Sequence, residues 1–459
     1  MTIAHGRLAS SWRRRLLHPW IAAVSFIVWF LWQSPLQWQY DSQQVYLGSR
    51  NILDWMQGRS NSVGQVGPYP LFQYISGVAA LWAGRRGFPV HPGSLWSTCS
   101  LLSLAGIVVV FHCVAGRMNR PAVGWAIMVV ILSGPLLMYA NCTFNESVAA
   151  LLILCFTAAA TGMAGPAVCA ALFWASGITK ETAPPLLAII WLGGLWMRRQ
   201  PLKGRSLIAQ AAALLIAMLV TLATNAGFNT LRYGKVWNVE YLNPPLLVHS
   251  WFWRAQYCLA LWLSPNGGIV PFWPTLAINM IGVIAIALRI RPGLAPALIV
   301  AVTLGGLTLG LSGWYQPFGW WAWGPRLMLP WMPACLLILL RGYPEAFARF
   351  VDRCVRQRRA LTITAAITML LALPHVMAAS EPRIVFPFFA NDWRYQHGVS
   401  AWQPEQQYAE NVFLAWEKMP PMLVRPIIEQ ATLMQFALAA CFLAALLILL
   451  LKCRSSLSR

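Results

Sequence analysis

Residues 38–83 read WQYDSQQVYLGSRNILDWMQGRSNSVGQVGPYPLFQYISGVAALWA, and we expect the rest of the chain to be arranged around this stretch. It directly follows the first hydrophobic segment, and Asp41 stands between Tyr40 and Ser42 where a membrane span should end. A carboxylate at such a position costs free energy unless water, a partner or a chemical role compensates it. No basic neighbour in the sequence explains Asp41, so we interpret it as a functional residue.

The composition around this stretch is that of a polytopic membrane protein. Of the 459 residues, 58% are hydrophobic and only 10% are charged, which is too little charged surface for a soluble globular protein. The net charge of +21 comes from Arg and Lys scattered between hydrophobic segments, not from one patch. We therefore interpret these residues as topology signals and expect no nucleic-acid partner.

Apolar segments of about 20 residues, the length that crosses a bilayer, recur along the whole chain. The fold class we predict is an all-α integral membrane protein with about 12 transmembrane helices and a long first external loop that contains interfacial helices. The predicted spans begin near His18, Ser94, Ala122, Ser147, Pro166, Pro184, Leu207, Val270, Leu294, Leu327, Leu361 and Ala431.

Basic residues set the orientation of these spans. With a cytoplasmic N-terminus, most of the 34 Lys and Arg fall on the cytoplasmic side, whereas only Glu345 and Asp352 of the 13 acidic residues do. We therefore predict a multi-pass protein of the plasma (inner) membrane with both termini in the cytoplasm. The first span stays as an uncleaved anchor, since no cleavage site follows it. Residues 70–82 form a helix at the outer interface, and the long external segments are 34–92, 228–268 and 380–430.

Polar residues gather at the span ends that this orientation places outside. We expect them to line an outward-facing cavity: Asp41, Asn141, Asn145, Glu146, Lys180, Glu181, Arg232, Lys235, Glu240, Tyr241, the Asn266-Gly-Gly turn and the segment from Trp320 to Arg326. A carboxylate near basic groups beside lipid suits a substrate with a phosphate leaving group and a hydrocarbon tail. Two structural readings stay open. Glu146 could have the purely structural role of stabilising the N-terminus of its helix through the helix dipole, and Lys180 and Glu181 could form a local ion pair.

Metal chemistry has no support in the sequence, because neither the 10 Cys nor the 7 His show metal-ligand spacing. We expect no metal and no cofactor besides the substrate itself.

Four motifs in chain order resemble the GT-C superfamily of integral-membrane glycosyltransferases, which use polyprenyl-phosphate-linked sugars. The first external loop reads YDSQQVYLGSRNI followed by GPYPLFQYISG, and GITKETAPPLL carries a Thr-Lys step at Lys180. NTLRYGKVWNVEY with LSPNGG follows, and WWAWGPRLMLPWMP ends the series at residue 333. The chain is similar in this to protein O-mannosyltransferases, lipid A aminoarabinose transferases and bacterial mannosyl- or arabinosyltransferases. It departs from relatives in having one Pro in the first turn and no Asp-x-Asp.

The resemblance implies a GT-C-like catalytic core over residues 1–341 and a C-terminal membrane region over residues 342–459. It implies an enzyme, a hexosyl- or pentosyltransferase, which moves a sugar with inversion from a polyprenyl-phosphate donor to an acceptor hydroxyl outside the cytoplasm. Its expected partners are that donor, a lipid, glycan or protein acceptor, and membrane lipids.

The same resemblance assigns roles to individual residues. Asp41 is the expected general base, and Glu146 is the second acidic candidate. Lys180 and Arg326 are the expected donor-phosphate ligands, with Arg232 in reserve. The expected substrate-lining residues are Tyr40, Tyr69, Glu181, Tyr241, Asn266 and Trp320.

Other functions of a multi-span protein remain as alternatives. A lipid-linked-saccharide flippase or transporter would need charged groups near mid-membrane, whereas the long apolar segments here carry almost none. An O-antigen ligase-like enzyme would emphasise a later external loop rich in Arg and His, whereas here the first external loop stands out.

Overall fold

The computed structural model describes residues 40–88, 91–140, 142–197, 204–242, 247–264, 267–290, 293–314, 318, 324–380 and 432–457. Within these ranges the regular secondary structure is helical, apart from one isolated bridge between Leu247 and Trp314. The helices are α3 (Tyr40–Met56), α4 (Leu71–Arg85), α5 (Pro92–Arg117), α6 (Pro121–Leu132), α7 (Leu136–Tyr139), α8 (Glu146–Ala158), the π-helical η1 (Ala159–Met163), α9 (Pro166–Thr179), α10 (Pro184–Trp196), α11 (Arg205–Tyr233), α12 (Trp251–Leu263), α13 (Ile269–Phe272), α14 (Pro274–Arg289), α15 (Ala295–Ser312), the 3-10 turn η3 (Leu329–Trp331), α16 (Met332–Gly342), α17 (Pro344–Val355), α18 (Arg358–Ser380) and α22 (Leu433–Leu457).

Six of these helical segments are long and apolar enough to cross a membrane: α5, α8 with η1, α11, α15, α18 and most of α22. Shorter apolar helices, of 10 to 17 residues, include α6, α9, α10 and α14. The protein is therefore an all-helical, polytopic membrane protein. The predicted spans after the first match helices whose starts lie within a few residues of the expected positions, whereas the predicted span near His18 lies outside the described residues.

Proline sets the start of many helices. It occupies one of the first two helical positions in α5, α6, α9, α10, α14 and α15, where its missing N–H has no intrahelical acceptor to lose. At the other end of α11, Gly234 stops the helix in the left-handed conformation with φ of +67°. These local signals explain why the starts were predictable.

The bundle has α8 at its centre and α11 at its rim. α8 packs against α5, α9, α16 and η3. Of the apolar stretch formed by α8 and η1, 72% is buried inside the protein, against 17% of the apolar stretch of α11. α11 exposes a row of large apolar side chains: Leu207, Ile208, Leu215, Ile216, Leu219, Val220 and Leu222. A helix with such a surface is suited to lipid contact. The C-terminal helices share this core, because α22 packs on α6 and α18, and α17 packs on α14.

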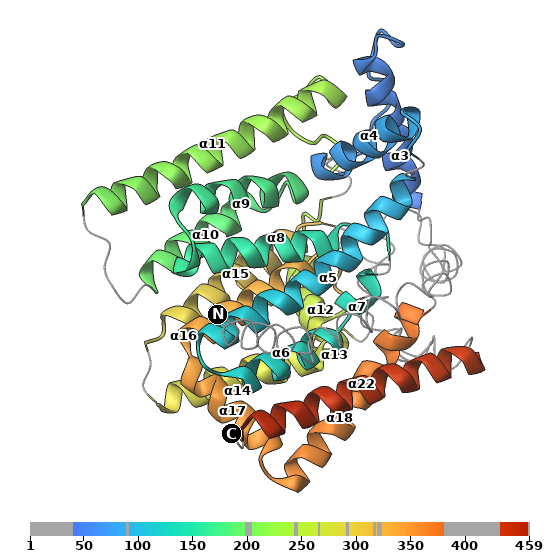
Figure 1. The fold of residues 1–459 in the computed structure, drawn as a ribbon. Coiled ribbons are helices and arrows are strands. Elements are labelled where there is room, and N and C mark those ends of the chain that lie inside the picture. The colour runs from blue at the N-terminus through green and yellow to red at the C-terminus, as the bar shows by residue number, and fades with distance from the viewer. Residues whose placement is uncertain are drawn as a thin grey trace, which may run out of the picture.

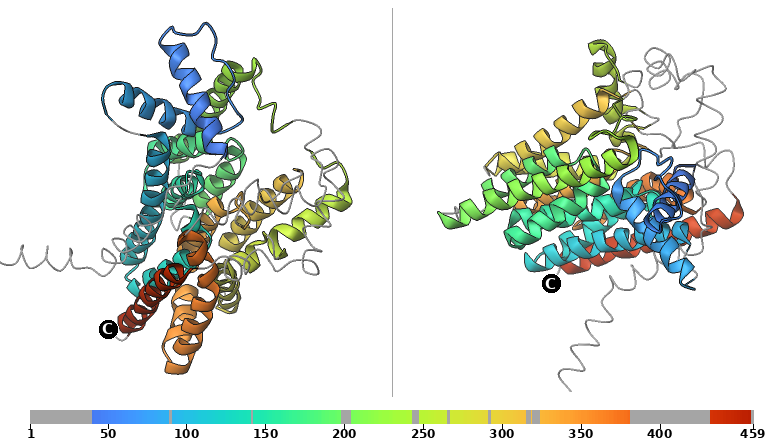
Figure 2. Two further views of the ribbon diagram at one scale, coloured as in Figure 1. Left: turned by 90° about the vertical axis from the view of Figure 1, so that its right-hand side faces the viewer. Right: turned by 90° about the horizontal axis from the view of Figure 1, so that it is seen from above.

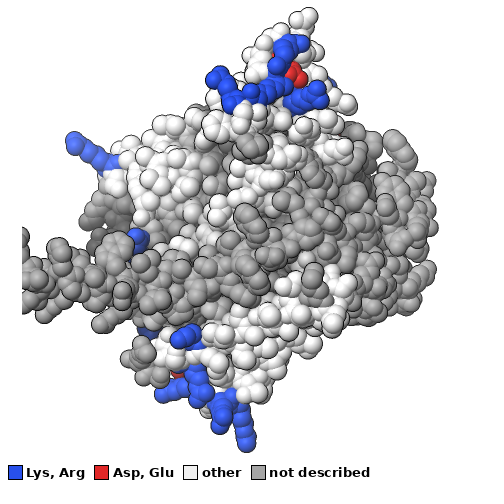
Figure 3. Space-filling model, turned by 45° about the vertical axis from the view of Figure 1, so that its right-hand side comes forward, with Lys and Arg blue, Asp and Glu red and all other residues white. Residues whose placement is uncertain are grey.

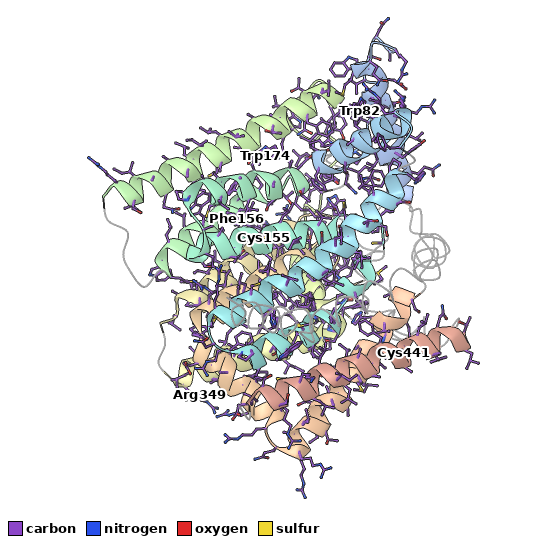
Figure 4. The ribbon with its side chains drawn as sticks, viewed as in Figure 1. Trp82, Cys155, Phe156, Trp174, Arg349 and Cys441 are labelled. Atoms are coloured by element: carbon purple, nitrogen blue, oxygen red, sulfur yellow. The ribbon has the colours of Figure 1, made fainter. Side chains whose placement is uncertain are left out.

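Polar and charged residues divide between the two ends of the bundle. The α3–α4 unit lies at the end where α5 starts and α11 stops (Figures 1 and 2). Figure 3 shows clusters of Lys and Arg at the top and at the bottom of the view, with a few more at its left. In Figure 4, Arg349 of α17 and Trp82 of α4 lie at opposite corners of the bundle.

Two described helices were not predicted, α12 and α17. α12 falls inside the segment expected as an external loop, where Arg254 and Gln256 interrupt its apolar sequence. α17 is amphipathic and carries Glu345, Arg349 and Asp352, so it does not have the uniform hydropathy of a span. Both helices pack on neighbouring helices through their apolar faces.

Close helix contacts in the core lead to a prediction at Gly194 of α10. A Cβ there would lie 2.6 Å from the carbonyl oxygen of Ala160, a backbone atom that cannot move aside as a side chain could. We expect Gly194→Ala to lower stability by about 1–3 kcal/mol, the usual cost of overpacking. Gly305→Ala in α15 is the matched control, because a Cβ there meets nothing within 4 Å. Thermal unfolding of the purified proteins in detergent measures both, and equal midpoints for the two variants would contradict this packing.

Candidate functional site

The loop that enters α8 is the meeting point of several distant segments. The Ser42 hydroxyl at the start of α3 contacts the Thr143 hydroxyl, and the Ser100 hydroxyl of α5 donates to the Phe144 carbonyl at 2.8 Å. The Asn145 amide donates to the carbonyl of Thr179, the last residue of α9, at 3.0 Å. The end of this loop, and therefore Glu146, is fixed against three helices.

Glu146 is completely buried and binds two cationic groups. Its Oε1 lies 3.0 Å from Lys180 Nζ and 3.0 Å from Arg326 Nε. The Arg326 guanidinium also lies over the Phe144 ring, with Cζ 3.7 Å from the ring centroid. The Lys180 and Arg326 side chains remain 15% and 12% exposed, whereas that of Glu146 is 0% exposed. The three residues form a compact cluster in which the acid is enclosed and the two cations reach the surface.

Electrostatics explain why the acid and the two bases stay together. A buried carboxylate is strongly unfavourable unless it is paired, and the N-terminus of α8 adds a favourable dipole. Glu146 Oε2 has no hydrogen-bond partner among the described residues, so both cations act through one oxygen. The cluster carries a net charge of +1, and this excess positive charge favours an anion beside Lys180 and Arg326.

The backbone around both cations is set locally. Lys180 is extended, with φ of −139°, directly after α9 ends at Thr179. Arg326 follows Gly324, which has φ of +70°, and a Cβ at Gly324 would lie 2.8 Å from the Phe272 ring. Glycine is therefore required at this turn both by conformation and by space.

A second cluster surrounds Arg232 near the end of α11. Its guanidinium donates to Glu181 Oε1 at 2.6 Å, to Asn229 Oδ1, and to the carbonyls of Gly67 at 3.1 Å and Tyr69 at 2.7 Å. The Asn238 amide, which donates to Pro68 O at 3.1 Å and Glu181 Oε2 at 3.2 Å, completes the cluster. We call this set, Gly67–Tyr69, Glu181, Asn229, Arg232 and Asn238, the Arg232 clamp. It ties residues 67–69 to the end of α11.

Burial is the main influence on the pKa of the Glu181 carboxyl group in the clamp. Burial raises the pKa of Glu181 above its ordinary value, and the Arg232 guanidinium and the Asn238 amide offset this rise only in part. Lys180 and Glu181 are neighbours in the chain, but Lys180 pairs with Glu146 and Glu181 pairs with Arg232. This Lys-Glu step therefore links the two clusters, and the two residues do not form a local pair.

We compared the chain with known protein families, sequences and structures. No family model matches the chain, and no curated protein sequence matches it. Among solved structures, the chain is similar to the crystal structure of ArnT from Cupriavidus metallidurans bound to undecaprenyl phosphate, with a TM-score of 0.51 and 16% sequence identity. The match covers 96% of this chain and 76% of ArnT. The chain has an ArnT-like fold. The GT-C resemblance predicted from the motifs is thus confirmed at the level of the fold.

In this ArnT-like fold, the predicted site residues fall into four groups. Glu146, Lys180 and Arg326 lie together, and Arg232 and Glu181 form the adjoining clamp. Tyr69 donates to Gln44 Oε1 at 3.0 Å, whereas the Tyr241 ring lies edge-on to Trp314, with the two ring centroids 6.1 Å apart. Tyr40 and Asp41 begin α3, but their side chains, like the whole of Asn266 and Trp320, lie outside the description.

Sequence reasoning missed several residues that hold the two clusters together. Asn229 and Asn238 lie in the same motif as Arg232, and their amide groups should have marked them as partners for a buried guanidinium. Ser42, Thr143 and Phe144 carry no comparable signal, because their contacts depend on segments far apart in the chain. In the described ranges, no three His, Cys, Asp or Glu side chains lie close enough together to hold a metal ion.

The clamp gives a stability prediction. Arg232→Gln would remove the cation that pairs with Glu181 and the donor to the Gly67 and Tyr69 carbonyls, and breaking a buried pair costs about 3–5 kcal/mol. We expect a clearly lower thermal midpoint, partly recovered in the Arg232→Gln/Glu181→Gln double variant. Arg205→Gln, at the exposed start of the same helix, is the control and should unfold like the unmodified protein. No recovery in the double variant would show that the pair is not coupled.

Proposed function

We propose that this chain is a membrane glycosyltransferase that moves a sugar from a polyprenyl-phosphate donor to an acceptor hydroxyl on the extracytoplasmic face. The observation that carries the proposal is the cluster in which Lys180 and Arg326, from distant segments, share the buried Glu146 carboxylate. The ArnT-like fold supports it, since the similar ArnT structure has undecaprenyl phosphate bound.

The two cations are suited to a phosphate leaving group. As the bond between the anomeric carbon and the phosphate oxygen breaks, its electron pair goes to the phosphate, which becomes a polyprenyl phosphate. Arg326 can offer a fork of N–H donors to phosphate oxygens, and Lys180 acts as a compact charge. Glu146 holds both side chains in place before the donor arrives, so little reorganisation is needed when charge develops.

Asp41 is the proposed general base. The Ser42–Thr143 contact brings the first turn of α3 beside the loop that ends at Glu146. In the proposed reaction, Asp41 accepts the proton of the acceptor hydroxyl while its oxygen bonds to the anomeric carbon. The phosphate leaves from the opposite side of that carbon, so the anomeric configuration is inverted.

The remaining predicted residues complete the proposed substrate site. Tyr69 is part of the Arg232 clamp, and the Tyr241 backbone N–H donates to Asn238 Oδ1 of the same clamp. Tyr40, Asn266 and Trp320 are proposed to line the sugar or the isoprenoid chain. Because Arg232 is engaged in the clamp, we propose that it positions the first external loop and that Lys180 and Arg326 bind the phosphate.

The orientation in the proposal follows the distribution of charge. Arg117, Arg289 and Arg341 end α5, α14 and α16 at the side of the bundle opposite the site, as expected if that side faces the cytoplasm. The site then opens outside the cytoplasm. Glu146 begins α8, Lys180 directly follows α9, and Arg326 lies in the turn before η3. These positions fit interfacial chemistry better than the mid-membrane charges of a transporter.

Reconstituted full-length protein tests the proposal with a panel of mannosyl, arabinosyl, aminoarabinosyl and glucosyl phosphoundecaprenols. The account predicts that at least one donor is converted to undecaprenyl phosphate when an acceptor-containing membrane extract is added. Movement of the intact donor across the bilayer without cleavage would instead support a flippase and contradict the transferase proposal.

A further inference from the structure

The α3–α4 unit contains a second polar pocket, separate from the two clusters described above. It has a volume of about 470 Å³ and lies between α3, the turn after it and the end of α4. Its lining residues are Arg50, Asn51, Asp54, Arg59, Ser60, Ser62, Val63, Gly64 and Arg85. The pocket therefore combines three guanidinium groups with a single carboxylate, and none of these residues belongs to the proposed catalytic site.

Two of the three guanidinium groups, those of Arg59 and Arg85, share the same two acceptors. Asp54 Oδ1 accepts from Arg59 Nε at 3.0 Å and from Arg85 Nη2 at 2.8 Å, and the Gln57 side-chain oxygen also accepts from both arginines. Arg50 is farther away, with its Nε 3.9 Å from Asp54 Oδ2. Each guanidinium has five N–H groups, and the described contacts use two in Arg59 and two in Arg85.

The charge of the pocket indicates the kind of ligand it binds. Three Arg and one Asp leave a net charge of +2, and Asp54 Oδ1 pairs with two of the arginines, Arg59 and Arg85. A preorganised array of guanidinium groups around a cavity is the arrangement that binds phosphate oxygens, because each planar fork can donate two N–H groups to one phosphate. Asn51, whose amide donates to Gln65 O at 2.9 Å, fixes the far wall.

The surroundings of the pocket indicate where the phosphate comes from. Trp55 and Met56 follow Asp54 on α3, and Trp82 and Phe88 flank Arg85; all four side chains are exposed. Arg86 lies over the Trp82 ring, 4.8 Å from its centroid. Figure 3 shows basic side chains around an acidic one on this projecting part of the molecule. Exposed Trp beside Arg is typical of the headgroup region of a membrane.

We propose that this pocket binds the phosphate of an anionic phospholipid headgroup, with Arg50, Arg59 and Arg85 as its ligands and the exposed apolar side chains against the acyl chains. Such a contact holds the α3–α4 unit on the membrane surface next to the site. Because its own residues carry it, the proposal stands whether or not the protein transfers sugars.

Hydrogen exchange of the full-length protein in a neutral detergent tests the site directly. Phosphatidylglycerol should slow exchange in peptides covering residues 50–65, at lower concentrations than phosphatidylcholine does. Arg50→Gln, the variant least involved in the internal contacts, should raise the concentration needed for half protection about tenfold, as expected for one lost charged hydrogen bond. Arg349→Gln removes the same charge from an exposed position on α17, outside the pocket and the proposed catalytic site, and should behave like the unmodified protein.

Two results would overturn the proposal. If Arg50→Gln is protected by phosphatidylglycerol as well as the unmodified protein is, the pocket is not the lipid site. If potassium phosphate at the same concentration gives the same protection as phosphatidylglycerol, the ligand is a soluble phosphate and the lipid assignment is wrong.

Discussion

Asp41→Asn should lower the rate of sugar transfer by about 10²- to 10⁴-fold, the usual contribution of a general base. Asparagine keeps the shape of the side chain but cannot accept the proton of the acceptor hydroxyl. Because α3 stays anchored by the Ser42–Thr143 contact and by its packing on α4, we expect normal expression and thermal stability. Initial rates of undecaprenyl phosphate release, measured at saturating donor, provide the test.

The control for this variant is Asp352→Asn, which makes the same chemical change on α17 at the opposite end of the bundle. It should retain full activity, since Asp352 contacts only Arg356 one turn away among the described residues. Full transfer activity in Asp41→Asn would remove Asp41 from the mechanism, while equal losses in both variants would indicate a general defect.

Arg326→Gln should reduce transfer by about 10²- to 10³-fold, the range found when one preorganised donor to a developing oxyanion is removed. The loss should fall on the chemical step and on donor affinity, because the phosphate that Arg326 is proposed to bind is the donor's leaving group. Arg326→Lys keeps the charge but loses the planar fork, so its activity should be intermediate. Kinetics with donor and acceptor varied separately distinguish these effects.

Arg349→Gln is the matched control for Arg326→Gln. Arg349 is exposed on α17 at the far corner of the bundle (Figure 4), so losing its charge should not change donor use. An equal fall in apparent affinity for donor and acceptor in Arg326→Gln would contradict a phosphate role and favour a structural role through Glu146.

Much of the fold was predictable because its signals are local. Proline at the helix starts and glycine at the end of α11 fix helix limits within a few residues, and uniform hydropathy marks the long spans. The two missed helices, α12 and α17, lack that uniformity. Their stability depends on packing against α15 and α14, which no local pattern records.

The sequence predicted which residues belong to the candidate site, but it did not predict which of them form ion pairs with each other. Motif order and membrane side identified Glu146, Lys180 and Arg326 as neighbours in one region, whereas their shared carboxylate contact joins segments far apart in the chain. Sequence proximity suggested a Lys180–Glu181 pair, yet the extended backbone at Lys180 sends the two side chains to different partners. Arg232 resembled a phosphate ligand in sequence because no sequence pattern reveals its acceptors, the distant carbonyls of Gly67 and Tyr69.

A structure of the full-length protein with undecaprenyl phosphate bound tests the central claim most directly. The account predicts phosphate oxygens within hydrogen-bonding distance of Lys180 and Arg326, with the Asp41 carboxylate facing the same cavity and Arg232 still paired with Glu181. A phosphate bound away from both Lys180 and Arg326, or an Asp41 side chain facing away from the lipid-filled cavity, would contradict the proposed transferase site.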